Sequence, residues 1–303
     1  MKILLLGKNG QVGWELQRSL AVLGEVIAPE RSDAQHGGDL AQPEALRAAI
    51  RRIAPQAIVN AAAYTAVDRA QSEAEQAHAI NTVAPQVLAQ EASALDAWLV
   101  HYSTDYVFDG SGHTPWREND ATAPLSVYGQ SKLAGEQAIA QSGAKHLILR
   151  TSWVYGAHGN NFLKTMLRLG AQRPELRIVA DQIGAPTGAE LLADATAQAL
   201  LQAMQGSPAF GGIYHLTASG ATSWFDYAQY IFEQARRIDP DTARAQLVPI
   251  PSSEYPTPAA RPLNSRLDTT HFEHTFGLTM PPWQQGVARV VAELLQPGWT
   301  QQL

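Results

Sequence analysis

The chain has no cysteine, no excess of basic charge and no long apolar run. Without cysteine among its 303 residues, disulfide bonds, thiolate nucleophiles and zinc sites with cysteine ligands are excluded. No apolar stretch approaches the roughly 20 residues that a membrane-spanning helix needs, so we expect no membrane partner. A strand is expected directly at the N-terminus with no signal peptide before it, and the expected location is therefore the cytoplasm.

Basic residues are scarce enough to argue against one large class of partner. The formal net charge is -6, from 22 basic and 28 acidic residues. Because the basic residues form no long run either, nucleic acid is not expected as the main partner. The length fits one large domain or two interlocked ones.

The first half of the chain alternates short apolar runs with helical patterns. The runs show no period-2 alternation, which is typical of strands that are buried on both faces. Such strand–helix repetition predicts an α/β fold with a Rossmann-type, doubly wound parallel sheet. The expected strands are residues 3–6, 25–28, 57–60, 98–103 and 146–151, and the expected helices are residues 11–23, 43–53, 73–95 and 128–142.

After Thr151 this rhythm breaks, which predicts a smaller, interleaved α/β region. We expect a first domain over residues 1–151, with 187–216 packing back on it, and a second domain over most of 152–303. The expected strands there are residues 177–180, 213–216 and 246–250, and the expected helices are residues 190–204, 224–235 and 282–295.

A glycine-rich segment follows the first expected strand and opens the first helix. Glycines at such a turn let the backbone approach a pyrophosphate, and the helix N-terminus supplies amide donors. The spacing, G-x-x-G-x-x-G, differs from the G-x-G-x-x-G fingerprint, but the strand–loop–helix context favours a dinucleotide site. The cofactor-binding candidates in this segment are Gly7, Asn9, Gly10, Gln11, Val12 and Gly13.

Two further positions bear on the choice of cofactor. Glu30, after the second strand, is placed to take the adenosine ribose hydroxyls, whereas Arg31 beside it would accept a 2′-phosphate, so NADH and NADPH both stay open. Asp39 and Leu40 either frame the adenine, or Asp39 caps the helix from Pro43. Small residues after the third strand would let the cofactor lie close to the backbone, and the candidates there are Ala62, Ala63, Tyr64 and Thr65.

Tyr128 and Lys132 are one helical turn apart and share one face of a helix. A nearby ammonium favours the phenolate, so we expect Lys132 to lower the pKa of Tyr128. A tyrosine tuned in this way exchanges a proton with a substrate oxygen near neutral pH. Thr104, at the carboxyl end of an expected strand, would hydrogen-bond the same oxygen. These three are the candidate catalytic residues.

With these motifs the chain resembles the extended short-chain dehydrogenase/reductase family. The resemblance is carried by residues 7–13, 60–63, 103–105 and 128–132, and it is closest to members that reduce dTDP-linked 4-keto-6-deoxysugars, through residues 62–68, 103–110, 150–156, 181–187 and 261–268. Related nucleotide-sugar dehydratases have an Asp-Glu pair after the threonine. Here Tyr106 follows Asp105, so the base for water elimination is missing and a simple ketone reductase is favoured.

The resemblance implies hydride transfer from NADPH or NADH to the C4 ketone of the sugar, in the biosynthesis of a cell-surface polysaccharide. Tyr128 would protonate the new alkoxide, Thr104 would hold the oxygen, and Lys132 would also hold the nicotinamide ribose. Trp153 and Arg261 each have an alternative to a substrate contact. Trp153 would then pack in the apolar interface between the domains, and Arg261 would be an exposed residue of a loop. The implied substrate contacts are Thr104, Asp105, Tyr106, Trp153, Arg261 and Asn264.

Some members of the family form homodimers held by magnesium. Glu15, Glu190 and Glu293 fall at the matching positions, although scattered helical glutamates are also common on solvated surfaces.

Two functions compete with the reductase: a nucleotide-sugar epimerase or dehydratase, and a non-catalytic regulatory subunit. The dehydratase lacks its acid–base pair here, and a regulatory subunit would have no need to retain Thr104, Tyr128 and Lys132 together.

Overall fold

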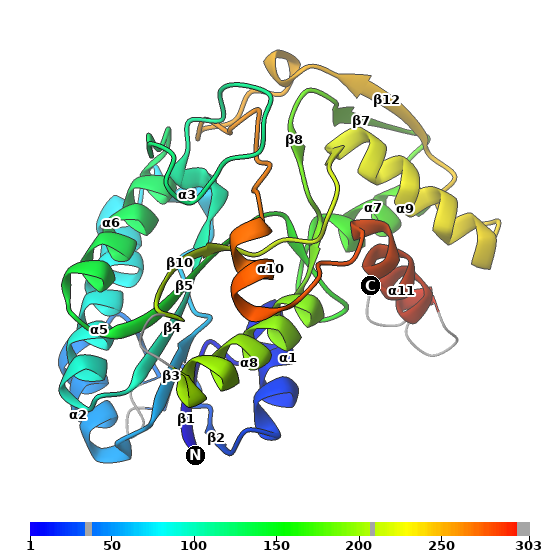
Figure 1. Cartoon of the computed structure of the whole chain (residues 1–303). Coiled ribbons are helices and arrows are strands. Elements are labelled where there is room, and N and C mark those ends of the chain that lie inside the picture. The colour runs from blue at the N-terminus through cyan, green and yellow to red at the C-terminus, as the bar shows by residue number, and fades with distance from the viewer. Residues whose placement is uncertain (34–37, 207–209, 296–303) are drawn as a thin grey trace.

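A computed structural model describes residues 1–33, 38–206 and 210–295 (Figure 1). Its larger body is built on a six-stranded sheet in the order β10-β5-β4-β3-β1-β2, with every neighbouring pair parallel. This confirms the predicted doubly wound α/β fold. The strands are β1 (Lys2–Leu6), β2 (Glu25–Ile27), β3 (Ala57–Asn60), β4 (Trp98–Thr104), β5 (Lys145–Thr151) and β10 (Gly212–His215).

Helices cover both faces of this sheet. Successive side chains of β1 point to opposite faces of the sheet. Ile3 and Leu5 belong to the apolar core on one face, and Leu4 and Leu6 belong to the core on the other. The strands therefore read as continuous apolar runs because both faces are buried. One core includes α1 (Gln11–Ala21), α8 (Ala189–Gln205) and α10 (Thr270–Phe276), and the other includes α2 (Pro43–Ile53), α5 (Ala84–Ala94) and α6 (Val127–Gln141).

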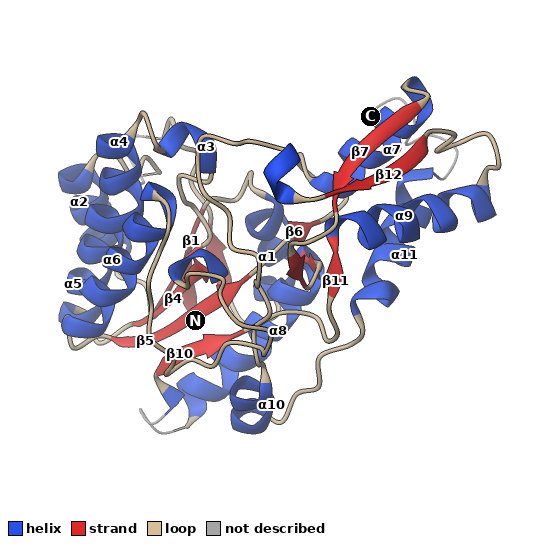
Figure 2. Cartoon of the chain, turned by 90° about the horizontal axis from the view of Figure 1, so that it is seen from above, coloured by secondary structure: helices blue, strands red, loops and turns tan. Residues whose placement is uncertain are grey.

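The smaller body has its own core, around Tyr227, Phe232 and Trp283. Figure 2 shows it projecting beyond the carboxyl ends of the sheet, with its paired strands β7 and β12 at the far side. The chain passes through this body and then returns to the larger one through α8 and β10. Its elements are β6 (Val154–Tyr155), α7 (Phe162–Gln172), β7 (Glu175–Val179), β8 (Ile183–Gly184), β9 (Thr187–Gly188), β11 (Thr222–Ser223), α9 (Trp224–Ile238), β12 (Gln246–Ile250) and α11 (Trp283–Leu295).

Side-chain caps set the start of several helices. Ser126 Oγ accepts from the backbone N–H of Gly129 at 3.2 Å and so begins α6, one residue before Tyr128 enters the helix. Asp39 does not cap α2, which begins at Pro43 with Gln42 before it. Its carboxylate instead accepts from the backbone N–H of Ala41 at 3.1 Å. The capping alternative for Asp39 is therefore wrong.

The single helix expected over residues 73–95 is divided in the structure. It consists of α4 (Ala74–His78), a π-helical turn (Ala79–Val83) and α5, after the short α3 (Val67–Ala70). The buried Asn81 lies in the π turn, where its amide bonds the backbone N–H and C=O of Tyr64 and donates to Ser131 Oγ at 3.0 Å.

Among the described residues, no helix is long and apolar enough to cross a membrane.

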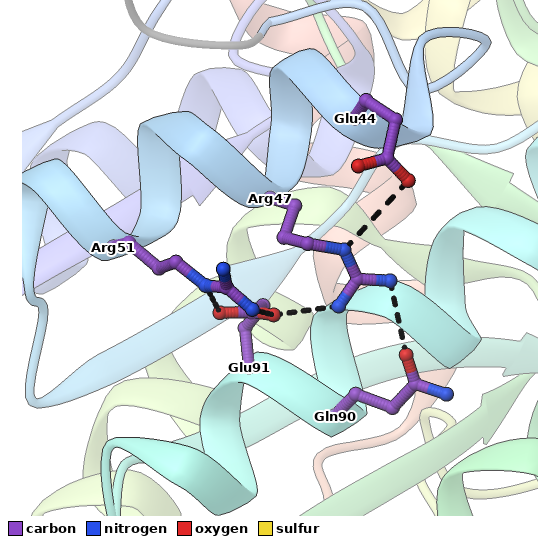
Figure 3. Close-up of polar contacts among 5 residues, drawn as sticks. All are labelled: Glu44, Arg47, Arg51, Gln90 and Glu91. Carbon is purple, nitrogen blue, oxygen red and sulfur yellow. Dashed lines mark hydrogen bonds and ion pairs between the residues drawn. The ribbon is translucent and has the colours of Figure 1, made fainter.

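Two buried carboxylates on the larger body, those of Glu91 and Glu136, are paired with guanidinium groups. The Glu91 cluster, which we define as Glu91 with Arg47 and Arg51, joins α5 to α2 (Figure 3). Arg47 Nη1 lies 2.6 Å and Arg51 Nε 2.7 Å from the Glu91 carboxylate, whose side chain is 3% exposed. Glu136 of α6 and Arg150 of β5 form a second pair at 2.7 Å, and both side chains are almost fully buried.

Candidate active site

The glycine segment forms a tight turn between β1 and α1. Gly7 has a φ of +87°, and a Cβ there would lie 2.7 Å from the backbone nitrogen of Ala62. A Cβ on Gly13 would lie 2.0 Å from the carbonyl oxygen of Gly7. A side chain at Gly7 would force the loops after β1 and β3 apart, and one at Gly13 would push α1 away from the turn. Glycine at both positions therefore allows the backbone-lined floor that a pyrophosphate needs.

A cavity of about 180 Å³ opens beside this turn. Seven of the predicted cofactor residues line it, together with two cations: Lys8, which the sequence did not suggest, and Arg31, which it suggested as a partner of a 2′-phosphate. Lys8 Nζ lies 2.8 Å from Glu30, and Arg31 lies 3.3 Å from Asp39. The lining residues that were predicted are Gly7, Asn9, Gly10, Asp39, Leu40, Ala62 and Ala63.

Glu30 is held at the rim by two neighbours. Its two carboxylate oxygens accept from Lys8 Nζ and from Asn9 Nδ2, the latter at 2.6 Å. The hydrogen bond from Lys8 is the main reason that the pKa of Glu30 lies below its usual range. The carboxylate is therefore charged and oriented at neutral pH, as an acceptor for hydroxyl groups requires.

The remaining predicted cofactor residues lie around the turn rather than on the cavity wall. Gln11 connects the two bodies, since its amide donates to the carbonyl of Val154 at 3.4 Å and accepts from Asn161 Nδ2 at 2.9 Å. Val12 packs against the core under α1. Tyr64 and the exposed Thr65 belong to the loop that Asn81 fixes from behind.

Thr104, Tyr128 and Lys132 come together at the carboxyl end of β4. Thr104 is the last residue of the strand, and Tyr128 is in the first turn of α6. The hydroxyl of Thr104 donates to Asp105 Oδ1 at 3.1 Å and accepts from the backbone N–H of Tyr106 at 3.2 Å. The ring of Tyr106 meets that of Tyr128 edge-on, at 5.6 Å between centroids.

Burial raises the pKa of Tyr128 to about 12, although a hydrogen bond with Thr104 acts in the opposite direction. The expectation that Lys132 lowers this pKa is wrong for the arrangement observed. Lys132 Nζ donates instead to the carbonyl of Tyr102 at 2.6 Å, and the groups that act on the phenol besides burial are Thr104 and Asp105. Tyr128 is consequently a phenol at neutral pH, the form that donates a proton.

Two other buried groups at this site also have displaced pKa values. Burial lowers the pKa of Lys132 to about 8, opposed by the charge of Glu136. Burial raises the pKa of Asp105 to about 6, opposed by hydrogen bonds from Ser265 and Thr104. Displaced pKa values that gather beside a cavity are typical of a catalytic site.

A second, larger cavity of about 690 Å³ lies between the two bodies. Tyr106 and Arg261 line it from the catalytic side, and Phe162 and Trp224 are aromatic walls from the smaller body. Its volume and its mixture of aromatic and guanidinium groups suit an aromatic ligand that carries phosphate.

Arg261 spans the two bodies at this cavity. Its guanidinium donates to both oxygens of Asp68, at 2.9 and 2.8 Å, and Asp68 also accepts from the backbone N–H of Ala259. The predicted phosphate contact therefore has a carboxylate partner in this state. Asp68 lies in the stretch 62–68 that carries the family resemblance, and the sequence suggested no role for it.

Trp153 and Asn264 lie near the cavity but have structural contacts. The ring of Trp153 stacks on Trp224 at 3.6 Å, and Gly184 packs so closely that a Cβ there would lie 2.6 Å from the indole. Asn264 Nδ2 donates to the carbonyl groups of Ser111 and Thr114, and its side chain is buried. Trp153 thus supports a residue of the cavity wall, and Asn264 anchors the loop beside it.

Glu15, Glu190 and Glu293 lie on α1, α8 and α11 and gather around one cation. Arg289 lies 2.9 Å from Glu190, and the charges of Glu293 and Glu15 also act on it. In the described part of the chain, no group of three or more carboxylate, histidine or cysteine side chains could hold a metal ion. The sequence pointed to the three glutamates as candidate metal ligands, but it did not point to Arg289, which lies between them.

The most informative residue without a role in the sequence interpretation is His101. It is a lone histidine in the apolar strand β4, 1% exposed, and its Nε2 lies 3.2 Å from Lys132 Nζ. A polar residue at a position expected to be buried was the available signal.

Comparison with known proteins gives one family over almost the whole chain. The family model described as the RmlD substrate binding domain matches residues 1–296. The dTDP-4-dehydrorhamnose reductase of Escherichia coli K12 is 55% identical over 97% of this chain and 98% of that protein. The reductase of the same name from Burkholderia thailandensis is 48% identical over 97% of this chain and 99% of that protein.

Solved structures agree with this similarity. A dTDP-4-dehydrorhamnose reductase from Bacillus anthracis in complex with NADP is 34% identical, with a TM-score of 0.88, covering 96% of this chain and 99% of that one. A dTDP-4-dehydrorhamnose reductase from Clostridium acetobutylicum is 35% identical, with a TM-score of 0.87, covering 97% of this chain and 99% of that one.

Proposed function

The chain belongs to the RmlD family, and from this premise we propose that it is a dTDP-4-dehydrorhamnose reductase. It reduces the C4 ketone of dTDP-4-dehydro-β-L-rhamnose to dTDP-β-L-rhamnose, with NADPH or NADH as reductant. The observation that carries the proposal is the meeting of Thr104, Tyr128 and Lys132 at the carboxyl end of β4, next to Tyr106, which lines the larger cavity. The product serves the synthesis of cell-surface polysaccharides such as lipopolysaccharide, and the expected location stays the cytoplasm.

The residues of this chain divide the work as follows. The nicotinamide, when bound, supplies the hydride. Tyr128, protonated at neutral pH, gives its proton to the oxygen that becomes an alkoxide, and Thr104 holds that oxygen by a hydrogen bond. Lys132, as an ammonium, offsets the charge left on the phenolate and holds the nicotinamide ribose. Arg261 binds the diphosphate, with its charge shared between the phosphates and Asp68.

The remaining predicted substrate contacts are Asp105, Tyr106, Trp153 and Asn264. Tyr106 lines the large cavity directly, whereas Trp153 acts through its stack on Trp224. Asp105 orients Thr104, and Asn264 positions the loop that borders the sugar.

The decisive experiment follows NAD(P)H oxidation with dTDP-4-dehydrorhamnose for the parent chain and for Tyr128→Phe. Loss of a general acid typically costs about 100-fold to 10,000-fold in rate, so we expect kcat to fall by that factor with KM little changed. Near-normal turnover by Tyr128→Phe would refute the role of Tyr128. No oxidation by the parent with any 4-keto sugar would instead favour the regulatory subunit.

For the cofactor, we propose that NADPH is used. Two cations, Lys8 and Arg31, stand at the rim of the smaller cavity, where a 2′-phosphate would gain from them, and a relative binds NADP. The test is the ratio of kcat/KM for NADPH and NADH, in the parent and in Arg31→Ala. A ratio that Arg31→Ala leaves unchanged would contradict the proposed role of this guanidinium.

We further propose a homodimer in which Glu15, Glu190 and Glu293 bind Mg²⁺. In a single chain these three glutamates surround Arg289. A bound Mg²⁺ therefore has to replace the Arg289 guanidinium as the partner of the carboxylates. Molar mass by light scattering, with magnesium and with EDTA, tests the proposal. A monomer under both conditions contradicts it, and Glu293→Gln is the matched variant in which the effect of magnesium should disappear.

A further inference from the structure

A buried histidine lies directly behind Lys132, on the strand that carries Thr104. His101 is the register partner of Asn60 across the pair β3–β4. Its two ring nitrogens face two different residues: Nδ1 lies 3.0 Å from Asn60 Nδ2, and Nε2 lies 3.2 Å from Lys132 Nζ. The mechanism described above gives this imidazole no part.

The donors and acceptors along the row Asn60, His101 and Lys132 can be assigned from the Asn60 end. Asn60 Oδ1 accepts from the backbone N–H of Ala62 at 3.1 Å, and a backbone N–H is always a donor. The amide oxygen of Asn60 is thereby assigned, and its NH₂ group is turned toward His101. Nδ1 of His101 has to accept, so the neutral ring carries its proton on Nε2.

The Nε2–H of His101 consequently points at Lys132 Nζ. An ammonium has only donors, so the charged form of Lys132 meets this N–H donor to donor, whereas an amine would accept it. Lys132 also donates to the carbonyl of Tyr102 at 2.6 Å, and an amine still has hydrogens for that bond. The geometry therefore favours one proton fewer on Lys132.

The surrounding charges do not reverse this preference. On α6, Glu136 attracts a proton to Lys132, but its carboxylate is bound by Arg150 of β5 at 2.7 Å. Tyr128, also on α6, is a neutral phenol, and β3 contributes the uncharged Asn60. Burial and the charge of Lys132 hold the pKa of His101 well below its usual value, so the ring stays neutral.

We propose that His101 is a positioning residue that acts through Lys132. Locked in its Nε2–H form by Asn60, it holds Lys132 Nζ against the carbonyl of Tyr102 and makes the ammonium easy to deprotonate. Lys132 then exchanges its proton within the pH range in which the enzyme works. The catalytic consequence rests on the proposed reductase function, whereas the protonation state of His101 does not.

The first test requires neither cofactor nor substrate. The full chain is labelled with ¹⁵N-histidine, and the signal of His101 among the nine histidines is the one missing from His101→Gln. The expected result is a protonated Nε2 and a bare Nδ1, unchanged between about pH 5.5 and pH 9, although an ordinary histidine titrates near pH 6.5. A proton on Nδ1, or a cationic ring at about pH 6, would overturn the proposal. Should His101→Gln fail to fold, His101→Asn, which keeps the contact with Asn60, provides the assignment.

The second test is the pH dependence of kcat. The carbonyl oxygen of a glutamine at position 101 reaches the place of Nε2 and accepts from an ammonium. His101→Gln should therefore move the loss of activity at alkaline pH upward by about one pH unit, a change equivalent to about 1.4 kcal/mol. A merely structural histidine would lower stability and leave the profile in place.

Thr196→Val is the matched control for the second test. It removes the buried hydrogen bond at 2.6 Å between the hydroxyl groups of Thr196, on α8, and Tyr102, on the same strand as His101. We expect it to lower the melting temperature and to leave the alkaline limit where it is. A folded His101→Gln whose profile coincides with that of Thr196→Val refutes the action on Lys132. If the parent itself proves inactive, the reductase function fails, and the labelled-histidine result still decides the state of His101.

Discussion

The Glu91 cluster and the catalytic pocket bury charged groups in opposite ways. Glu91 is bound by two guanidinium groups, and the hydrogen bond from Arg51 is the main reason that its pKa is low. Lys132 has a carbonyl and an imidazole beside it, and burial moves its pKa toward the neutral form. Charges that are paired join elements of the fold, whereas a charge left without a counter-ion is held in a state from which a proton moves easily.

Breaking the most deeply buried pair should give the largest loss of stability. Arg150→Leu leaves the carboxylate of Glu136 buried without its guanidinium, and removing one partner of such a pair costs about 3–5 kcal/mol. Urea denaturation at neutral pH measures the loss. The double variant Arg150→Leu with Glu136→Leu should recover most of it, and a double variant as unstable as the single one would contradict the explanation.

Replacing Lys132, which has no counter-ion among the described residues, should raise the stability of the folded protein instead of lowering it. The pKa of Lys132 falls from a usual value near 10.4 to about 8, so the folded state disfavours its charge by roughly 3 kcal/mol below pH 8. Lys132→Met should be inactive but more stable than the parent at pH 7, by up to that amount.

The pH dependence of Lys132→Met provides its control. Between pH 8 and about pH 10.4 the unfolded parent binds more protons than the folded one, so the parent gains stability as the pH rises. The variant lacks this gain, and the two curves should converge toward pH 10. A Lys132→Met protein less stable than the parent at every pH would show that Lys132 supports the fold as the Glu91 cluster does.

Glu91→Gln should cost less than Arg150→Leu, because Arg51 is largely exposed and water replaces part of its interaction. We expect a loss of about 1–3 kcal/mol, in the range for hydrogen bonds to charged groups. Since the pKa of Glu91 is lowered, its contribution is complete above the unfolded value near 4.3 and disappears as the pH falls through the folded value. Denaturation should give a larger difference between parent and variant at pH 7 than at pH 3.

The smallest effect on stability should come from Asp68→Asn. The pair with Arg261 is partly exposed, and such pairs contribute about 0–1 kcal/mol. The variant should still raise KM for the dTDP-sugar a few-fold, since Asp68 holds both Arg261 and the Ala259 backbone at the cavity. A stability loss comparable to that of Glu91→Gln would place this pair with the structural clusters.

The sequence predicted those features that depend on neighbours along the chain. Continuous apolar strands identified the sheet, and the four-residue spacing placed Tyr128 and Lys132 on one face of α6. The direction of the Tyr128 pKa could not be predicted, because it depends on how much water the folded chain removes. The role of His101 was missed because it arises from its register with Asn60 in a different strand.

The substrate cavity was equally inaccessible to a linear pattern. Its walls come from Tyr106, Phe162, Trp224 and Arg261, which are separated by up to half of the sequence. A family motif supplied Arg261 as a candidate, but its partner Asp68 lies on α3, far away along the chain. Arg289 among the three glutamates is a similar case, since no spacing relates it to α1.

The last strand of the large sheet has a consequence for synthesis on the ribosome. β10 pairs with β5, although α7, α8 and the strands β6, β7, β8 and β9 are made between them. Until residue 215 has left the ribosome, β5 presents an unpaired parallel edge, a surface to which other chains attach. The nascent protein thus has a window of exposure some sixty residues long, and it closes only after half of the smaller body has been made, which favours early chaperone protection of that edge.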